Sequence, residues 1–120
     1  MSWTVEYTDE FGAGFDGLEE REQNRLVAAV QRLEAQGPSL EYPHSSGIVN
    51  SRHEHMRELR VQIGGHPFRA FYAFDPRRNA ILLIGGDKTG DTRFYDRMIP
   101  MADDLYDTHL EELRKEGLLP

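Results

Sequence analysis

The chain has 120 residues, no cysteine, and 21 Asp or Glu against 14 Lys or Arg, for a formal net charge of −7. This length can bury a hydrophobic core, and the lack of cysteine excludes a disulfide framework, a thiolate nucleophile and a Cys-ligated zinc. Because no apolar run nears the roughly 18 residues of a membrane span and no signal-peptide pattern opens the chain, we expect one cytoplasmic domain, residues 1–120, without a membrane partner.

The acidic charge is unevenly distributed. Residues 1–43 hold three Lys or Arg and nine Asp or Glu, and residues 100–120 hold two and six. Residues 44–99 instead hold nine Lys or Arg and six Asp or Glu, with four of the five histidines. The acidic ends are expected to be solvated helix faces. The net charge argues against a polyphosphate partner, but the basic centre keeps one open.

The first third of the chain predicts a strand and a helix. Residues 3–7 alternate between apolar and polar, which is the period of a half-buried strand. Glycines in residues 12–17 are expected to break this pattern. The spacing then predicts a helix from Phe15 or Asp16 to Gln36, ended by Gly37 and Pro38, with a stripe that packs on a sheet: Leu26, Val30 and Leu33.

A long connector and a β-hairpin are predicted next. Residues 38–55 contain turn-forming residues and at most a short extended piece at 48–49. Alternation returns over residues 58–63, the two glycines at 64–65 indicate a tight turn, and residues 68–74 form the return strand.

The last third predicts a third strand and a second helix. Residues 75–79 have turn chemistry, and residues 80–84 are continuously apolar, as expected of a strand covered on both faces. Residues 85–91 are expected to be loop. Apolar residues then recur at helical spacing over about 100–117, with Pro100 near the helix start. The order of elements indicates an α+β domain.

Two arginines mark the hairpin as the place to look for function. Arg60 and Arg69 fall within a residue or two of facing each other across the two strands. Like charges so placed need an anion, a carboxylate or solvent, and Glu58 and Asp75 are the obvious carboxylates. A surface salt-bridge network and a phosphate clamp both fit this pattern, and the sequence leaves the choice open.

Further basic and aromatic residues follow the third strand. Lys88 comes directly after it, and Arg93 and Arg97 flank Phe94 and Tyr95. Basic residues beside aromatic ones can hold backbone phosphates and stack an unpaired base. Phe94 is instead expected to seat the last helix on the sheet, while Tyr95 fits either role.

Histidines of the connector suggest proton transfer rather than metal binding. His53 and His55 share one face of an extended segment, but two imidazoles without a clear third ligand fall short of a catalytic zinc site, so we expect no metal. His53, His55 and His66 could exchange protons near neutral pH, or be ordinary solvated histidines.

The order of these motifs resembles the phage-derived HigB branch of the RelE/ParE toxin superfamily. The resemblance covers about residues 3–97 and rests on residues 57–60, the glycine turn, residues 68–72, the apolar strand and Lys88. It implies a small RelE-like α+β domain: an antiparallel sheet with helices packed on one face, an open face for messenger RNA, and an additional C-terminal helix. One departure is that Asp87 and Lys88 stand where many members carry paired lysines.

The resemblance also implies a function. It suggests the toxin of a type II toxin–antitoxin pair, an endoribonuclease that cleaves messenger RNA on the ribosome by attack of a ribose 2′-OH on the neighbouring phosphate, without metal or cofactor. By position, the expected catalytic residues are Arg60, Arg69, Lys88, Tyr95, Asp96 and His55. The expected RNA-binding residues are Arg57, Arg93, Arg97 and His53.

The resemblance implies a helix-turn-helix antitoxin as partner, within a toxin–antitoxin hetero-oligomer, and a homodimer is also open. Two other functions remain: a non-catalytic, ParE-like inhibitor of a topoisomerase, and an inactive phage-derived protein.

Overall fold

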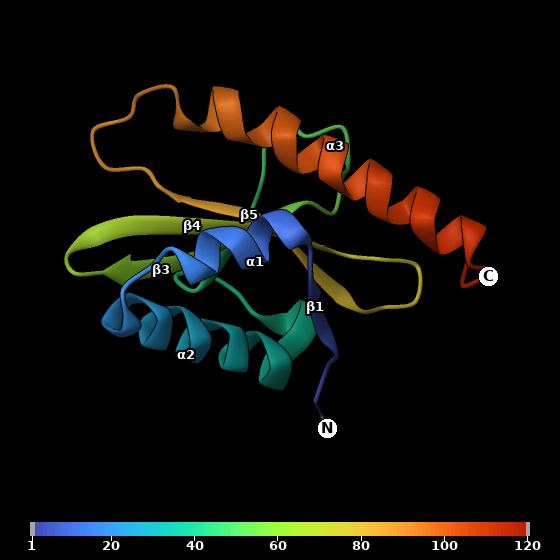
Figure 1. The fold of residues 1–120 in the computed structure, drawn as a ribbon, viewed down its shortest axis with the longest axis horizontal. Helices are drawn as coiled ribbons and strands as arrows, with labels where there is room; N and C mark the ends of the chain where they lie inside the picture. Colours follow the sequence, from blue (N-terminus) through green and yellow to red (C-terminus); the bar gives the residue numbers. More distant parts are fainter. Residues whose placement is uncertain (1, 120) are drawn as a thin grey trace.

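The computed structural model describes residues 2–119, which form a five-stranded sheet with helices on both faces (Figure 1). In chain order the elements are β1 (Val5–Tyr7), α1 (Asp9–Asp16), α2 (Glu20–Gln36), the short 3-10 helix η1 (Gly37–Ser39), β2 (Ser45–Gly47), β3 (Arg57–Ile63), β4 (His66–Phe74), β5 (Ala80–Asp87) and α3 (Phe94–Lys115). None of the helices in residues 2–119 combines the length and apolar character that a membrane span requires.

The strand order in the sheet is β1-β5-β4-β3-β2. β3, β4 and β5 form the predicted antiparallel meander, and β2 adds to β3 in antiparallel fashion. β1 instead pairs with β5 in parallel. The α+β prediction is confirmed, with a sheet that is mixed rather than antiparallel throughout.

The β3–β4 hairpin follows the prediction closely. Gly64 and Gly65 have φ of 58° and 80°, as required at both centres of a two-residue turn whose twist suits a hairpin. Side chains at these positions would be strained, which explains the pair of glycines. The turn fixes the register, and it sets Arg60 directly opposite Arg69.

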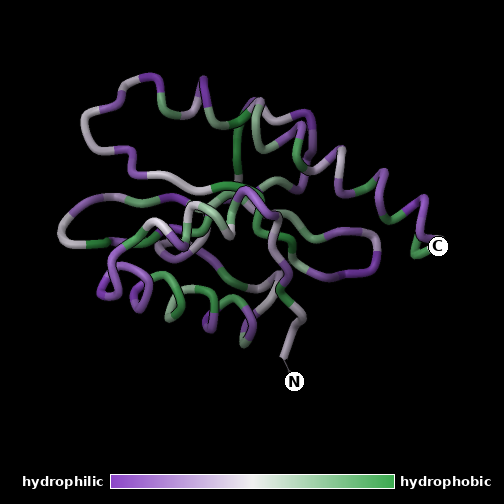
Figure 2. The backbone as a smooth tube through the Cα atoms, viewed as in Figure 1, coloured by the Kyte–Doolittle hydropathy of each residue, from purple (hydrophilic) through white to green (hydrophobic). Residues whose placement is uncertain are grey.

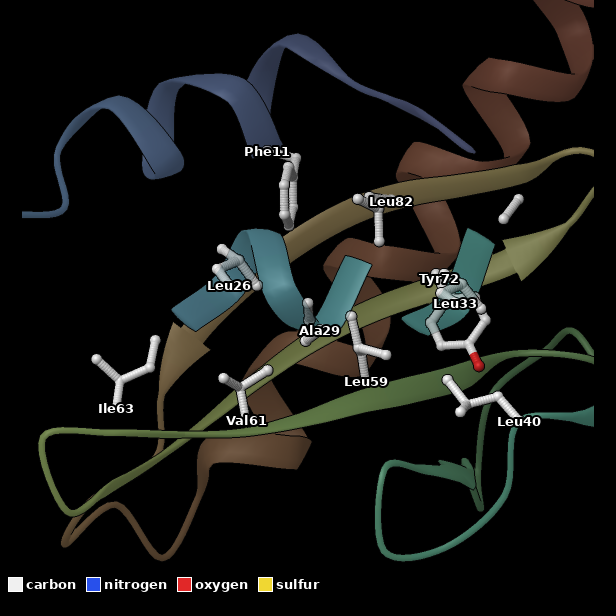
Figure 3. Close-up of a cluster of buried hydrophobic side chains, with 12 residues drawn as sticks. Phe11, Leu26, Ala29, Leu33, Leu40, Leu59, Val61, Ile63, Tyr72 and Leu82 are labelled. Atoms are coloured by element: carbon white, nitrogen blue, oxygen red, sulfur yellow. The ribbon is translucent and has the colours of Figure 1, made fainter. Parts of the chain in front are cut away.

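One face of the sheet is covered by α1 and α2 (Figure 3). Leu26 and Leu33 of α2 are buried against the sheet, confirming the predicted apolar stripe. The single helix predicted from Phe15 is wrong, because the chain forms two. The Thr8 hydroxyl caps the Phe11 N–H at 3.0 Å and starts α1 upstream of the glycines, two of which lie inside that helix.

α3 covers the other face of the sheet (Figure 1). Its buried side chains, Phe94, Met98, Ile99, Ala102 and Tyr106, meet Met56, Phe71, Ala73, Ile81 and Leu83 of the sheet side. Figure 2 shows hydrophobic stretches in the strands at the centre, whereas hydrophobic and hydrophilic residues alternate along α2 and α3. The face expected to be open is covered here, and the arginine pair lies beside the first turn of α3.

Three predicted boundaries are wrong for identifiable reasons. α3 begins at Phe94, and Pro100 lies inside it, because Phe94 and Met98, both N-terminal to the proline, bury their side chains. β5 continues to Asp87 because the ring of Phe68 covers Gly85 and that of Phe94 covers Gly86.

The connector strand, β2, lies at residues 45–47 rather than at 48–49. It is polar, and its buried Ser45 hydroxyl bonds the Tyr72 hydroxyl at 2.6 Å.

Candidate functional site

The arginine pair is bridged by a buried glutamate. Glu58 and Arg60 point to the same face of β3, because side chains two residues apart on a strand share a face. Arg60 Nη1 donates to Glu58 Oε2 at 3.1 Å, and Arg69 Nε lies 3.6 Å from Glu58 Oε1. The carboxylate thus separates two cations that would otherwise repel each other across the ladder.

The two arginines differ in accessibility. The Arg69 side chain is 6% exposed and that of Arg60 is 26% exposed. Arg69 Nη1 donates to the Phe68 carbonyl at 3.0 Å, while its buried Nε–H has no hydrogen-bond partner among residues 2–119. An unsatisfied buried donor costs about 1–3 kcal/mol, which an additional acceptor would relieve.

Tyr95 and Lys88 complete this cluster. The Tyr95 hydroxyl donates to Glu58 Oε1 at 2.6 Å, and Lys88 Nζ lies 5.7 Å from the centre of the Tyr95 ring. Burial raises the pKa of Tyr95, and the hydrogen bond and charge of Glu58 raise it further, more than Arg69 lowers it. The phenol is therefore held protonated beside the arginine pair.

Sequence reasoning missed two residues of this site and undervalued Glu58. Ser46 Oγ donates to Glu58 Oε2 at 2.7 Å, and the exposed Tyr42 ring lies 5.1 Å from the Arg60 guanidinium carbon. Glu58 was expected as a carboxylate partner of the arginines, and the structure confirms that contact, whereas Asp75, the other expected carboxylate, pairs with Arg77 instead. Ser46 and Tyr42 come from the connector, and no periodicity in the sequence reveals their approach.

Three predicted residues lie around the first turn of α3. Asp96 is exposed and lines a groove that also includes Glu58 and Tyr95. Arg97 pairs with the Asp91 carboxylate at 2.8 Å, and Arg93 is exposed immediately before the helix. These basic side chains border the cluster without joining it.

The structure does not bring the other predicted residues to the arginine pair. Arg57 points to the α2 face of β3, where its Nε donates to Ser45 Oγ at 3.0 Å. His55 is exposed on a separate hollow with Trp3 and Phe74. His53 packs its ring against Tyr106 and lies 2.7 Å from Asp107, so it fastens the connector to α3.

A second polar cluster, Glu6, Asp75 and His109, has the spacing of a metal site, with ligand atoms within 4.8 Å of one another. Arg77 pairs with both Asp75 and Glu6, and His109 Nε2 lies 2.9 Å from Asp75 Oδ2. Burial alone would raise the pKa of Asp75, but hydrogen bonds from Arg77 and His109 lower it overall. The cluster therefore serves as an ion-pair network that joins β1, the β4–β5 turn and α3.

The arginine cluster can bind and stabilise an anion. Arg60, Arg69 and Lys88 carry three positive charges and Glu58 one negative charge, which leaves two positive charges beside a protonated phenol. Fixed donors in a partly dry site stabilise developing charge more strongly than donors in water. This arrangement therefore suits an anion, including one whose negative charge increases during a reaction.

Comparison with known proteins finds a family and two toxin-named relatives. The family model described as "Phage derived protein Gp49-like (DUF891)" matches residues 13–107. The chain is 36% identical over 114 residues to "Putative toxin HigB2" of Mycobacterium tuberculosis, covering 93% of this chain and 56% of that protein. It is 44% identical over 79 residues to "Putative toxin HigB3" of the same organism, covering 65% of this chain and 68% of that protein. The chain thus spans about half the length of the first relative and two thirds of the second.

Solved structures share the fold. A chain of the archaeal RelE–RelB complex from Pyrococcus horikoshii OT3 matches with a TM-score of 0.56 at 13% identity, over 75% of this chain and 99% of that chain. The isolated E. coli RelE toxin matches with a TM-score of 0.57 at 7% identity, over 81% and 96%. The fold of this chain is RelE-like.

Proposed function

Because this chain belongs to the phage-derived Gp49-like family of HigB-type proteins, we propose that it is the toxin of a toxin–antitoxin pair, an endoribonuclease that cleaves messenger RNA on the ribosome. The observation that carries this proposal is the direct opposition of Arg60 and Arg69, with Lys88 and Tyr95 beside them. The toxin names of the two relatives support it.

The proposed reaction is a transesterification within the RNA. The ribose 2′-oxygen attacks the adjacent phosphorus and loses its proton, the bond from phosphorus to the 5′-oxygen breaks, and the 5′-oxygen gains a proton. The products are a 2′,3′-cyclic phosphate and a 5′-hydroxyl. Negative charge on the phosphate rises in the transition state, and this charge is what the arginine cluster would stabilise.

Accessibility divides the roles within the cluster. Arg60 and Lys88 are half-buried and would contact the phosphate oxygens. Arg69 lies behind them, where its unpartnered Nε–H adds positive potential. Tyr95 is the proton-transfer group in this proposal, because its hydroxyl lies at the arginine pair, donates to Glu58 Oε1 at 2.6 Å and keeps its proton at neutral pH.

The proposal includes a partner and a location. We propose a helix-turn-helix antitoxin as the partner, in line with the RelE–RelB complex whose fold this chain shares. Residues 3–97 and α3 would act together as one toxin unit, because the first turn of α3 supplies Tyr95. A messenger RNA on the ribosome places this activity in the cytoplasm.

Induced expression of the chain without its partner tests this function. The wild type is expected to arrest growth and to create new 5′ ends inside translated messages, whereas Arg60→Ala should do neither. Arg114→Ala is the matched control, because Arg114 is exposed at the far end of α3, and it should behave as wild type. Growth arrest without new transcript ends would instead indicate a non-catalytic inhibitor, and growth without arrest an inactive protein.

A further inference from the structure

A groove lies directly beside the arginine cluster, between the connector and α3. Its walls are residues 47–50 on one side and Asp96, Ile99 and Pro100 on the other, and Glu58 and Tyr95 form its floor. Its volume is about 430 Å³. We call it the connector groove. It is large enough for a single nucleobase and opens to solvent.

The connector groove is held in shape by polar contacts to α3. The buried Asp103 accepts hydrogen bonds from the Ser51 hydroxyl at 2.5 Å and from the Arg52 N–H at 3.0 Å. The Arg52 guanidinium pairs with Asp104 and Asp107, and His53 also contacts Asp107. These contacts anchor residues 51–53, directly after the connector wall, to α3.

The upper walls of the groove are apolar although they face solvent. Val49 is 78% exposed, Pro100 is exposed and Ile48 is half-buried. Exposed apolar side chains contributed by both the connector and α3 suit a flat, largely apolar ligand. With the aromatic ring of Tyr95 at the floor, the groove offers surfaces on which a base can stack.

The polar edge of the groove offers acceptors. The Asp96 carboxylate makes no hydrogen bond or ion pair with any other residue in 2–119 and lines the groove. Because proline has no N–H, Pro100 also leaves the Asp96 carbonyl without its usual partner in the helix. Glu58 is already occupied by Ser46, Arg60 and Tyr95. Asp96 and the Asn50 amide, which also lines the groove, are thus the groove side chains without a hydrogen-bond partner among residues 2–119, and Asp96 is the charged acceptor of the two.

The groove and the arginine cluster share Tyr95. Its hydroxyl bonds the glutamate between the arginines, its ring lies near Lys88, and it also lines the groove. A phosphate held by Arg60 and Lys88 would therefore lie next to a base in the groove. The two sites could in this way bind the phosphate and the base of a single nucleotide.

We propose that the connector groove binds one unpaired guanine of an RNA chain, with Asp96 accepting from its Watson–Crick edge. Guanine presents two adjacent donors there, N1–H and the N2 amino group, which match the two oxygens of a carboxylate. Adenine, cytosine and uracil each place an acceptor beside their donor, so Asp96 would face a lone pair. This inference rests on the proposed function and specifies which nucleotide the site prefers.

The test uses RNA that cannot be cleaved, so that binding is measured apart from catalysis. Trinucleotides methylated at every 2′-oxygen, with G, A, C or U in the middle and A on both sides, are titrated into the protein and followed by backbone-amide NMR. The wild type is expected to bind the G trinucleotide about tenfold more tightly than the others, since a bidentate pair gives discrimination of this order.

Two variants make the result specific. Asp96→Asn should remove the preference for guanine, while Glu111→Gln, which deletes a carboxylate on the same helix outside the groove, should keep it. Equal binding of the four trinucleotides, or binding of none, would overturn the groove proposal. If the four trinucleotides bind equally and Arg60→Ala weakens the binding of all four, the groove proposal is overturned. The phosphate site of the proposed function would still stand in that case.

Discussion

Replacement of Glu58 by glutamine is the most informative perturbation of the site. The carboxylate accepts from Tyr95 and faces Arg69 on Oε1, and it accepts from Ser46 and Arg60 on Oε2. Glutamine has one acceptor oxygen and one NH₂ group. In either orientation that NH₂ points at an arginine N–H. Because both groups can only donate, they cannot form a hydrogen bond with each other.

The cost follows from the burial of the group. The side chains of Glu58 and Arg69 are each 6% exposed, so Glu58→Gln leaves a buried cation without its counter-charge. Removal of one partner from a buried pair typically costs about 3 kcal/mol or more, which lowers the melting temperature of a domain of this size by about 10 °C. Ser46→Ala removes a single donor to the same carboxylate and should cost only about 1 kcal/mol.

Urea unfolding followed by circular dichroism measures both variants. A Glu58→Gln protein within about 1 kcal/mol of wild type would refute the idea that this carboxylate holds the arginines in place. The coupling is checked by a double-mutant cycle with Arg60→Ala, whose effect should be smaller in the Glu58→Gln background than in the wild type.

Three further predictions concern titration and the connector. Glu58→Gln should lower the pKa of Tyr95, because the charge and hydrogen bond that help to raise it are lost while Arg69 remains; ¹³C-tyrosine NMR reads this shift, and an unchanged titration would contradict it. The pKa of Asp75 is lowered by folding, so the stability it contributes is present above its unfolded value, about 3.9, and is lost as pH falls through the folded value. Urea unfolding should therefore be measured from about pH 6 to about pH 2, a range that spans about 3.9. The free energy of unfolding should fall less on acidification in Asp75→Asn than in wild type; equal losses would contradict this. Asp103→Ala should free the connector at Ser51, so amide exchange of residues 50–53 should quicken by about tenfold while β4 stays protected; exchange as slow as in the wild type would show that other contacts hold it.

The hairpin was predictable because local rules determine it. Alternation over residues 58–63 and two glycines at the turn specify strand faces, turn type and register together. The opposition of Arg60 and Arg69 follows from these rules alone. A sequence with the same arginines and a longer turn would not have allowed this inference.

Boundaries that depend on tertiary contacts were not predictable. Pro100 marks a plausible helix start, but burial of Phe94 and Met98 outweighs the one hydrogen bond that the proline removes. The two glycines after Ile84 suggest a loop, yet aromatic rings from β4 and α3 cover them and keep them in the strand.

The chemistry of the site was only partly predictable for the same reason. Tyr95 contacts Glu58 although the two residues are 37 positions apart in the sequence. Ser46 contacts the same carboxylate from a connector that has no periodicity. Asp104 and Asp107 of α3 are solvated as expected and also pair with the connector, but Asp103 is buried and binds it. Composition reveals such charges, whereas only the fold reveals what they contact.

Cleavage of a defined message on purified ribosomes tests the central proposal most directly. The purified wild-type chain should cut the message, leave a 2′,3′-cyclic phosphate, and fail to cut when the nucleotide at the cleavage site carries 2′-deoxyribose. Arg60→Ala should reduce the single-turnover rate by roughly a hundredfold, because a fixed donor to the developing charge is lost. Cleavage of the 2′-deoxy message, or an Arg60→Ala protein as fast as the wild type, would contradict the proposed chemistry.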